Sequence, residues 1–176
     1  TAAQVEEALA RGQDIEEERG DWVKTTPLLS ACQRGELEVV DCLLNHGADP
    51  NHRPEKALMS PIQTAVKEGH VAVAERLVKA GADINDNQEG GCGETPLIIA
   101  SRQGHVDVVD YLLSQGVDKE AKDVLSRTPL MWASLYGNID VADRLLAAGC
   151  DVNVGDDRGT TALVMASEVG HVPIID

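Results

Sequence analysis

The chain has 176 residues and carries 30 acidic against 15 basic residues, which gives a formal net charge of −15 at pH 7. This negative charge opposes the counterion release that supplies most of the affinity for nucleic acids, so a DNA or RNA partner is disfavoured. No segment approaches the roughly 18 consecutive apolar residues of a membrane-spanning helix, so we expect no membrane contact by this segment. Aromatic residues make up 2% and Phe is absent, so the core must consist of Leu, Val, Ile and Ala, which suits closely packed helices.

The first predicted element is an amphipathic helix within residues 1–20. Val5, Ala8 and Leu9 share one face of this helix and form its apolar stripe.

From residue 21 onward a pair of helices is predicted to recur. Each copy opens with a Thr-Pro-Leu triplet or a close variant, and successive triplets are 33 to 35 residues apart. A helix is expected to begin there, because the hydroxyl can cap its first turn and Pro is preorganised for the first helical position. A Gly nine residues after the Thr or Ser supplies the left-handed conformation that ends a helix. The triplets begin at Thr26, Ser60, Thr95, Thr128 and Thr161, and the glycines are Gly35, Gly69, Gly104, Gly137 and Gly170.

A second helix follows in each copy, with its apolar residues three or four apart, as in Val106, Val109 and Leu112. It is expected to end at a further Gly that opens a polar turn of the type Gly-Ala-Asp-x-Asn. These turns occupy 47–51, 81–85, 116–120 and 149–153, the last two with relaxed sequences.

Three landmarks in phase resemble the ankyrin repeat, a unit of about 33 residues with the signature Thr-Pro-Leu-His-x-Ala. The resemblance implies an all-α fold, an ankyrin-repeat solenoid of stacked helix-turn-helix units with projecting β-hairpin fingers. It makes residues 1–176 a single array, which we expect to be part of a longer one because neither end carries a polar capping repeat. The array comprises a half unit at 1–20, full units at 21–54, 55–89, 90–122 and 123–155, and an incomplete unit at 156–176. The signature His is replaced by Leu29, Gln63, Ile98, Met131 and Val164.

The resemblance implies binding of a protein partner through a concave groove and the finger tips, in a scaffold or adaptor role. Five positions in each unit would line this surface, and together they include six basic and four acidic residues. A mildly basic groove on an acidic body predicts a partner with an acidic or polar segment and an apolar anchor, although these charges could also serve solubility alone. The predicted partner-binding residues are Trp22, Arg34, Lys67, Arg102, Val124, Leu125, Arg127, Leu135 and Tyr136.

Aromatic and apolar side chains are expected to supply most of the affinity, since interface hot spots favour Trp, Tyr and Arg. In the fourth unit the pairs Val124-Leu125 and Leu135-Tyr136 form a predicted apolar patch, which a monomer has little reason to expose. Trp22 could instead pack against the first half unit, and Trp132 is predicted to be a core residue.

The cysteines and histidines do not form a catalytic or metal-binding pattern. The cysteines lack Cys-x-x-Cys spacing and a matching pair of histidines, so we predict no metal, no cofactor and no small-molecule substrate. Free thiols in a reducing cytoplasm or nucleus are expected. His70, His105 and His171 each follow a repeat Gly, so they are assigned a structural role. No Walker loop, G-x-S-x-G or H-E-x-x-H motif occurs, so no enzymatic activity is predicted.

Asn85 and Asn153 are candidates for hydroxylation. Both follow Asp and a β-branched residue, with Leu77 and Leu145 eight residues earlier. This is similar to the segment that cytosolic asparaginyl hydroxylases modify in ankyrin repeats. The alternative is a structural role in the turn, for which Asn is suited.

Two further functions remain open beside a scaffold or adaptor. The array could regulate a larger enzyme or ion channel in the same chain, or it could belong to a pathogen or symbiont effector that engages host proteins. A fold by itself does not choose among them.

Overall fold

The computed structural model describes residues 1–18, 25–54, 59–87 and 91–170, and it divides the chain into two compact units, Thr1–Asp83 and Ile84–Asp176. Within the described residues the structure contains ten helices and no strand, apart from an isolated antiparallel bridge between Gly155 and Thr161. The predicted all-α repeat fold is therefore confirmed. The described finger loops at 123–127 and 156–160 are tight loops rather than paired strands.

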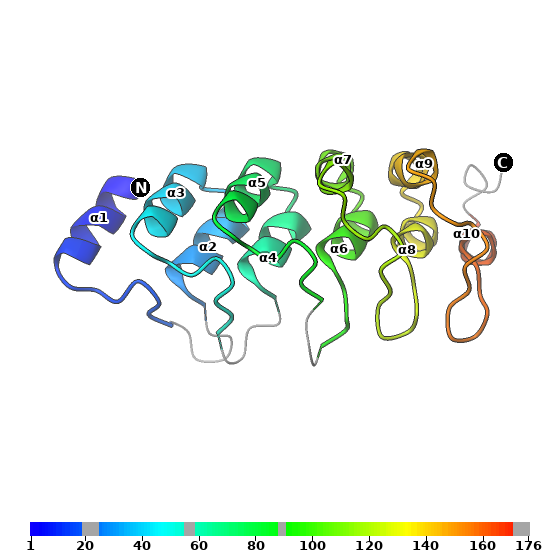
Figure 1. Ribbon diagram of the computed structural model, residues 1–176, viewed down its shortest axis with the longest axis horizontal. Coiled ribbons are helices and arrows are strands. Elements are labelled where there is room, and N and C mark those ends of the chain that lie inside the picture. Colours follow the sequence, from blue (N-terminus) through cyan, green and yellow to red (C-terminus); the bar gives the residue numbers. More distant parts are fainter. Residues whose placement is uncertain (19–24, 55–58, 88–90, 171–176) are drawn as a thin grey trace. The chain divides into compact units, whose positions relative to one another are not determined.

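In the first unit the helices form two rows (Figure 1). Helix α3 packs on α1 and α5 in one row, and α2 packs on α4 in the other. Each of the pairs α2–α3 and α4–α5 is one predicted repeat. The helices are α1 (Ala2–Ala10), α2 (Pro27–Arg34), α3 (Leu37–Asn45), α4 (Pro61–Lys67) and α5 (Val71–Lys79).

The second unit repeats this arrangement. Helix α8 packs on both α6 and α10, whereas α7 packs on α9, and α6 and α8 each pack on the helix that follows them in the chain. The helices are α6 (Pro96–Gln103), α7 (Val106–Ser114), α8 (Pro129–Tyr136), α9 (Ile139–Ala147) and α10 (Ala162–Val169).

The helices α2, α6 and α8 begin and end as their sequences predict. At α8 the Thr128 hydroxyl accepts the Met131 N–H at 3.4 Å, Pro129 is the first helical residue, and Gly137 ends the helix with φ 70°. Thr26 and Thr95 cap α2 and α6 in the same way. The second helices α3, α5, α7 and α9 each end two residues before the expected Gly, and Gly116, for example, then takes φ 72° in the turn.

The core consists of small aliphatic side chains, as the composition predicts. Ile98 and Ile99 of α6, Leu112 of α7 and Leu145 of α9 are fully buried between the two rows of the second unit. Such side chains allow close helix packing, and burying each of them contributes about 1.5–3 kcal/mol.

Within each unit, polar side chains join neighbouring repeats. His70 Nε2 lies 3.3 Å from the carbonyl oxygen of Gln33, so His70 has the structural role predicted for it. Its ring lies against Gly35, where an added Cβ would come within 2.6 Å of it. At the matching position in the second unit, the Asn138 amide donates to the carbonyls of Ser101 and Arg102 at 2.8 and 2.9 Å.

The polar turns join neighbouring repeats as well. The Asn51 side chain donates to the Gly81 carbonyl at 2.9 Å and accepts the Asp83 N–H at 2.8 Å. The predicted hydroxylation targets, Asn85 and Asn153, occupy the matching place in later turns and both are exposed.

Candidate protein-binding surface

The predicted binding residues of the first unit are Trp22, Arg34 and Lys67. Arg34 donates from Nε and Nη2 to both carboxylate oxygens of Glu36, at 2.8 and 3.2 Å. This pairing raises the pKa of Arg34 and lowers the pKa of Glu36. The exposed Lys67 ammonium lies 3.9 Å from Glu68. Trp22 lies outside the described residues.

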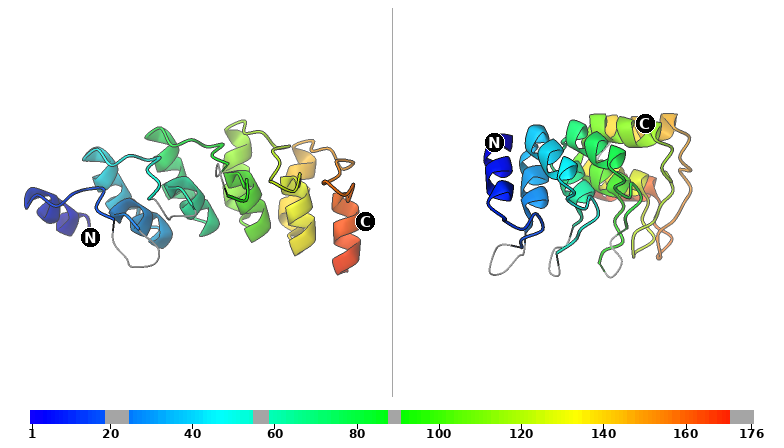
Figure 2. Two further views of the ribbon diagram at one scale, coloured as in Figure 1. Left: turned by 90° about the horizontal axis from the view of Figure 1, so that it is seen from below. Right: turned by 60° about the vertical axis from the view of Figure 1, so that its left-hand side comes forward.

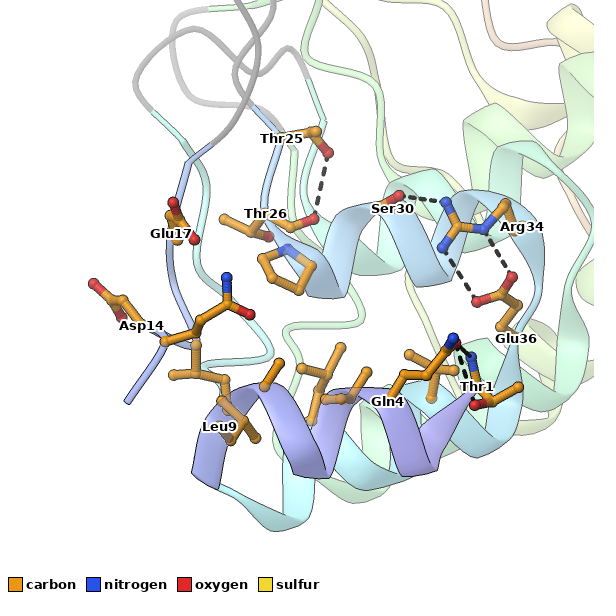
Figure 3. A pocket seen from close by; sticks show the side chains of 17 residues that line it. Thr1, Gln4, Leu9, Asp14, Glu17, Thr25, Thr26, Ser30, Arg34 and Glu36 are labelled. Carbon is orange, nitrogen blue, oxygen red and sulfur yellow. Dashed lines mark hydrogen bonds and ion pairs between the residues drawn. The ribbon is translucent and has the colours of Figure 1, made fainter. Parts of the chain in front are cut away.

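Arg34 also borders a cavity of about 330 Å³ between α1, α2 and α3 (Figure 3). Its Nη1 donates to Ser30 at 2.6 Å, so its guanidinium is held by two neighbours on its own side of the cavity. The apolar stripe of α1, including Val5 and Leu9, forms part of the wall. Because both carboxylate oxygens of Glu36 accept hydrogen bonds from Arg34, Glu36 largely neutralises the positive charge of Arg34.

In the second unit, Asp123 shapes the finger that carries Val124 and Leu125. Its Oδ1 accepts the N–H groups of Leu125 and Arg127 at 2.9 and 2.8 Å, and its own N–H donates to the Arg127 carbonyl at 3.1 Å. These bonds close the loop at its base. The tip residues stand out from it, with Val124 61% and Leu125 47% exposed.

Trp132 was predicted to be a core residue, and this was wrong, because the side chain is only half-buried. Its indole N–H donates to Asp123 Oδ2 at 3.0 Å, which requires the ring edge to lie at the base of the finger. Its ring packs on Tyr136 with centroids 5.9 Å apart and planes inclined by 29°. A buried Trp usually needs a partner for its N–H, and here the buried carboxylate of Asp123 at the base of the finger supplies it.

Two predicted binding residues meet at this indole. The guanidinium carbon of Arg102 lies 5.6 Å from the Trp132 ring centroid, and that of Arg127 lies 5.2 Å from it. Both distances are within the range of cation–π attraction. Tyr136 is 53% exposed beside them, whereas Leu135 is half-buried in the last turn of α8.

Buried carboxylates lie behind the two arginines. Glu94 accepts Arg102 Nη2 at 3.0 Å, and Asp156 lies 3.9 Å from Arg127 Nε. Burial raises the pKa of Glu94, an effect that Arg102 opposes and Asp123 reinforces. The pKa of Asp156 is lowered, chiefly because its carboxylate accepts the backbone N–H of Thr160.

Neighbouring fingers of the second unit are joined to one another. The Val124 N–H donates to the Cys92 carbonyl at 3.1 Å, and the Asp157 N–H donates to the Leu125 carbonyl at 3.3 Å. The Ser126 hydroxyl adds a bond to Asp157 Oδ1 at 2.5 Å. The loops at 123–127 and 156–160 project on the same side of the unit (Figure 2). They therefore present a connected edge rather than separate loops.

The Trp132 surface is defined here as the side chains of Arg102, Val124, Leu125, Arg127, Trp132 and Tyr136. The sequence predicted five of these residues and missed Trp132. It also missed the supporting carboxylates Asp123 and Asp156, although a signal was present, because each lies five residues before the Thr of its repeat.

Helix pairs that recur about every 33 residues and are joined by finger loops define a helical repeat solenoid. A family model for ankyrin repeats (3 copies) matches residues 2–88, 62–156 and 123–176. The chain belongs to the ankyrin repeat family, whose repeats generally mediate protein–protein interaction.

The chain is also similar to Alpha-latrocrustotoxin-Lt1a of Latrodectus tredecimguttatus, with 29% identity over 118 residues. The match covers 67% of this chain and 8% of that relative. Among the described residues, no helix has the length and apolar character needed to cross a membrane.

Proposed function

We propose that the array is a protein-binding module with a scaffold or adaptor role, and that its partner docks on the Trp132 surface. The observation that carries this proposal is the exposure of Val124, Leu125 and Tyr136 on a fixed frame. Exposed apolar and aromatic groups that lie together mark interaction sites, and Trp, Tyr and Arg dominate the energy of such sites.

The rigidity of the surface supports this proposal. Asp123 fixes the finger and the indole together, and backbone hydrogen bonds fix the finger to its neighbours. A surface that is already ordered loses little conformational entropy when a partner binds.

A reducing compartment, the cytoplasm or nucleus, is part of the proposal. All four cysteines are free thiols, with Cys32, Cys42 and Cys150 buried and Cys92 exposed. Proteins of oxidising compartments more often use their cysteines in disulfides.

The second candidate is a regulatory array within a larger enzyme or channel. It is favoured by the match to a relative of which this chain spans only 8%. An effector that engages host proteins is a related candidate, and the relative's name describes a toxin. Flanking sequence and genomic context distinguish these roles, and all of them use the repeats to bind protein.

Affinity purification from cells of the source organism tests the proposal. Three baits are compared. The first is the native chain, the second carries Leu135→Ala and Tyr136→Ala, and the third carries Val124→Ser and Leu125→Ser. The control is Leu146→Ser, which removes an exposed apolar side chain from α9 in the other row. We expect both surface variants to lose a partner that the control retains. A partner captured equally by all baits would refute docking on this surface.

We also propose Asn85 and Asn153 as hydroxylation sites. Both are exposed, so a modifying enzyme could reach them after local opening of the turn. Mass spectrometry of the chain from cells that contain an asparaginyl hydroxylase should show one added oxygen on either residue. Unmodified peptides at both positions would dismiss this proposal.

A further inference from the structure

We infer that the Trp132 surface recognises a peptide segment with two features: a carboxylate that meets Arg102 and Arg127, and a bulky apolar side chain that packs on Tyr136 and Leu125. This inference rests on the proposed protein-binding function and specifies the chemistry of the partner.

The charges of this site are arranged in two layers. The inner layer holds Glu94, Asp123 and Asp156, of which Glu94 is 6% exposed, Asp123 9% exposed, and the Asp156 side chain 6% exposed. The outer layer holds the guanidinium groups, with the Arg102 side chain 23% and the Arg127 side chain 27% exposed. A partner therefore meets the two guanidinium groups before it meets these three carboxylates.

A basic partner segment fits this arrangement poorly. To pair with the inner carboxylates it would have to displace the indole N–H of Trp132 from Asp123 and the guanidinium of Arg102 from Glu94. Breaking such charge-assisted hydrogen bonds costs more than exposed ion pairs return. The exposed carboxylate of Asp157, on the next finger, already accepts the Ser126 hydroxyl.

The arginines retain donors for an incoming carboxylate. A guanidinium has five N–H groups, and Arg102 gives its Nη2 to Glu94. Arg127 Nε lies 3.9 Å from Asp156, which is too long for a hydrogen bond. The Nε atoms of both residues are buried, so the donors that face a partner are the Nη groups, and the bond from Arg102 Nη2 to Glu94 is the one hydrogen bond that these groups make among the described residues. A ligand oxygen placed between the two side chains would satisfy donors that the protein leaves unused.

The indole holds these donors in place. Both guanidinium groups lie within 6 Å of the Trp132 ring centroid, and Arg is the side chain whose planar fork combines stacking with bidentate carboxylate recognition. Tyr136 stacks on this indole, and Val124 and Leu125 stand on the finger whose Asp123 accepts the indole N–H, so an apolar side chain close to the carboxylate in the partner would reach them.

The net charge of the chain predicts how the association rate constant of the peptide depends on ionic strength. An acidic peptide is repelled at long range by the charge of −15, while it is held at short range by the two arginines. Raising the ionic strength should therefore increase the association rate constant. Removing the arginines should act mainly on the dissociation rate.

A random 12-residue peptide library displayed on phage, selected against residues 1–176, tests the inference. The enriched peptides should contain Asp or Glu near a bulky apolar residue. Replacing that acid by its amide should weaken binding to the native array at least about tenfold, since hydrogen bonds to charged groups are worth that much. The same replacement should have little effect on an Arg102→Gln and Arg127→Gln variant.

The controls separate the inference from the proposed function. Arg144→Gln removes a positive charge that is paired with Asp110 in the other row, and it should leave peptide binding unchanged. The peptide substitutions leave the fold of the array untouched, so they remain informative even where the arginine variant is less stable. Peptides that depend on Tyr136 but tolerate the loss of their acid would overturn the inference alone. Peptides that bind equally to Tyr136→Ser and Val124→Ser variants would overturn docking on this surface as well.

Discussion

Asp123 accepts three hydrogen bonds, from Leu125, Arg127 and Trp132, and so holds the finger and the indole in one arrangement. In Asp123→Asn, the single amide oxygen cannot serve both sides, and the NH₂ group must face a donor. We expect a loss of about 1–3 kcal/mol in the free energy of unfolding, the cost of an unsatisfied buried group. Urea denaturation measures this loss. Asp107→Asn, at an exposed position of α7, is the control, and an equal effect there would contradict the assigned role.

Because of Glu94, the array should be more stable at mildly acidic pH than at neutral pH. Burial raises the pKa of Glu94 in the folded chain, so the folded chain binds the proton more tightly than the unfolded chain. Its contribution to stability is therefore present in full below the unfolded pKa and is lost as the pH rises through the raised folded pKa.

Melting temperatures measured from pH 4 to pH 7 for the native chain and Glu94→Gln test this effect. Relative to the variant, the native chain should gain stability as the pH falls. A difference in melting temperature between the native chain and Glu94→Gln that does not change with pH would contradict this role of Glu94.

Cys92 should be the reactive thiol of the native chain. Burial raises the pKa of Cys32 to about 12 and that of Cys150 to about 11, and it raises the pKa of Cys42 as well. These thiols are protonated at neutral pH and inaccessible, whereas Cys92 is exposed. Iodoacetamide followed by peptide mass spectrometry should label Cys92 first. Cys92→Ser should abolish the fast phase, and rapid labelling of Cys32 in the folded chain would contradict this assignment.

At the scale of single residues, the sequence predicted exposed groups better than supporting ones. Counting from the repeat Thr locates Arg102, Arg127 and Tyr136, because these positions follow from the period. Trp132 was misassigned because its neighbours in the helix are apolar, and the partner of its N–H belongs to the finger before the helix. A contact of that kind depends on the path of the loop, which the helical pattern does not describe.

Among the helices, α8 and α10 differ in how they begin. The Thr128 hydroxyl accepts the Met131 N–H and Pro129 follows it, whereas Thr161 makes no side-chain cap bond and Ala162 follows it. Thr128→Ala should therefore lower the free energy of unfolding by about 1 kcal/mol, the usual cost of removing a cap. Thr161→Ala serves as the matched control and should cost less. Thermal denaturation measures both, and equal losses would contradict the difference in capping.

Helix limits were largely predictable because capping is local. The Thr-Pro start and the left-handed Gly end of α2, α6 and α8 are properties of a few adjacent residues. The expected β-hairpin fingers were less accurate. The loop at 123–127 is closed by two backbone bonds and the Asp123 side chain, which leaves too few residues for a strand ladder.

For the whole molecule, stability should be divided along the chain, because within each unit a repeat packs on its immediate neighbours. Leu145 is fully buried in α9, and Leu145→Ala should cost about 2–5 kcal/mol through the lost contacts and the remaining cavity. Hydrogen exchange should then speed up in α7, α8 and α9 while α2 and α3 keep their protection. A uniform increase over all helices would contradict this division.

The count of charged residues did not predict how the charges of the surface are paired. Counting charged residues predicted a mildly basic strip, but the structure pairs Arg34 with Glu36, Arg102 with Glu94, and Arg127 with Asp156. What distinguishes the Trp132 surface is the depth of each charge, since the carboxylates lie beneath the guanidinium groups. Depth depends on side-chain packing, which a composition count does not contain.

The fingers of the second unit are linked through backbone atoms at Cys92, Val124, Leu125 and Asp157. Those links do not depend on which side chains the two tip residues carry. Val124 and Leu125 can therefore be randomised together while the frame is preserved. Exchanging these two residues therefore varies the exposed tip without changing its frame, which makes this loop a starting point for selecting binders to other targets.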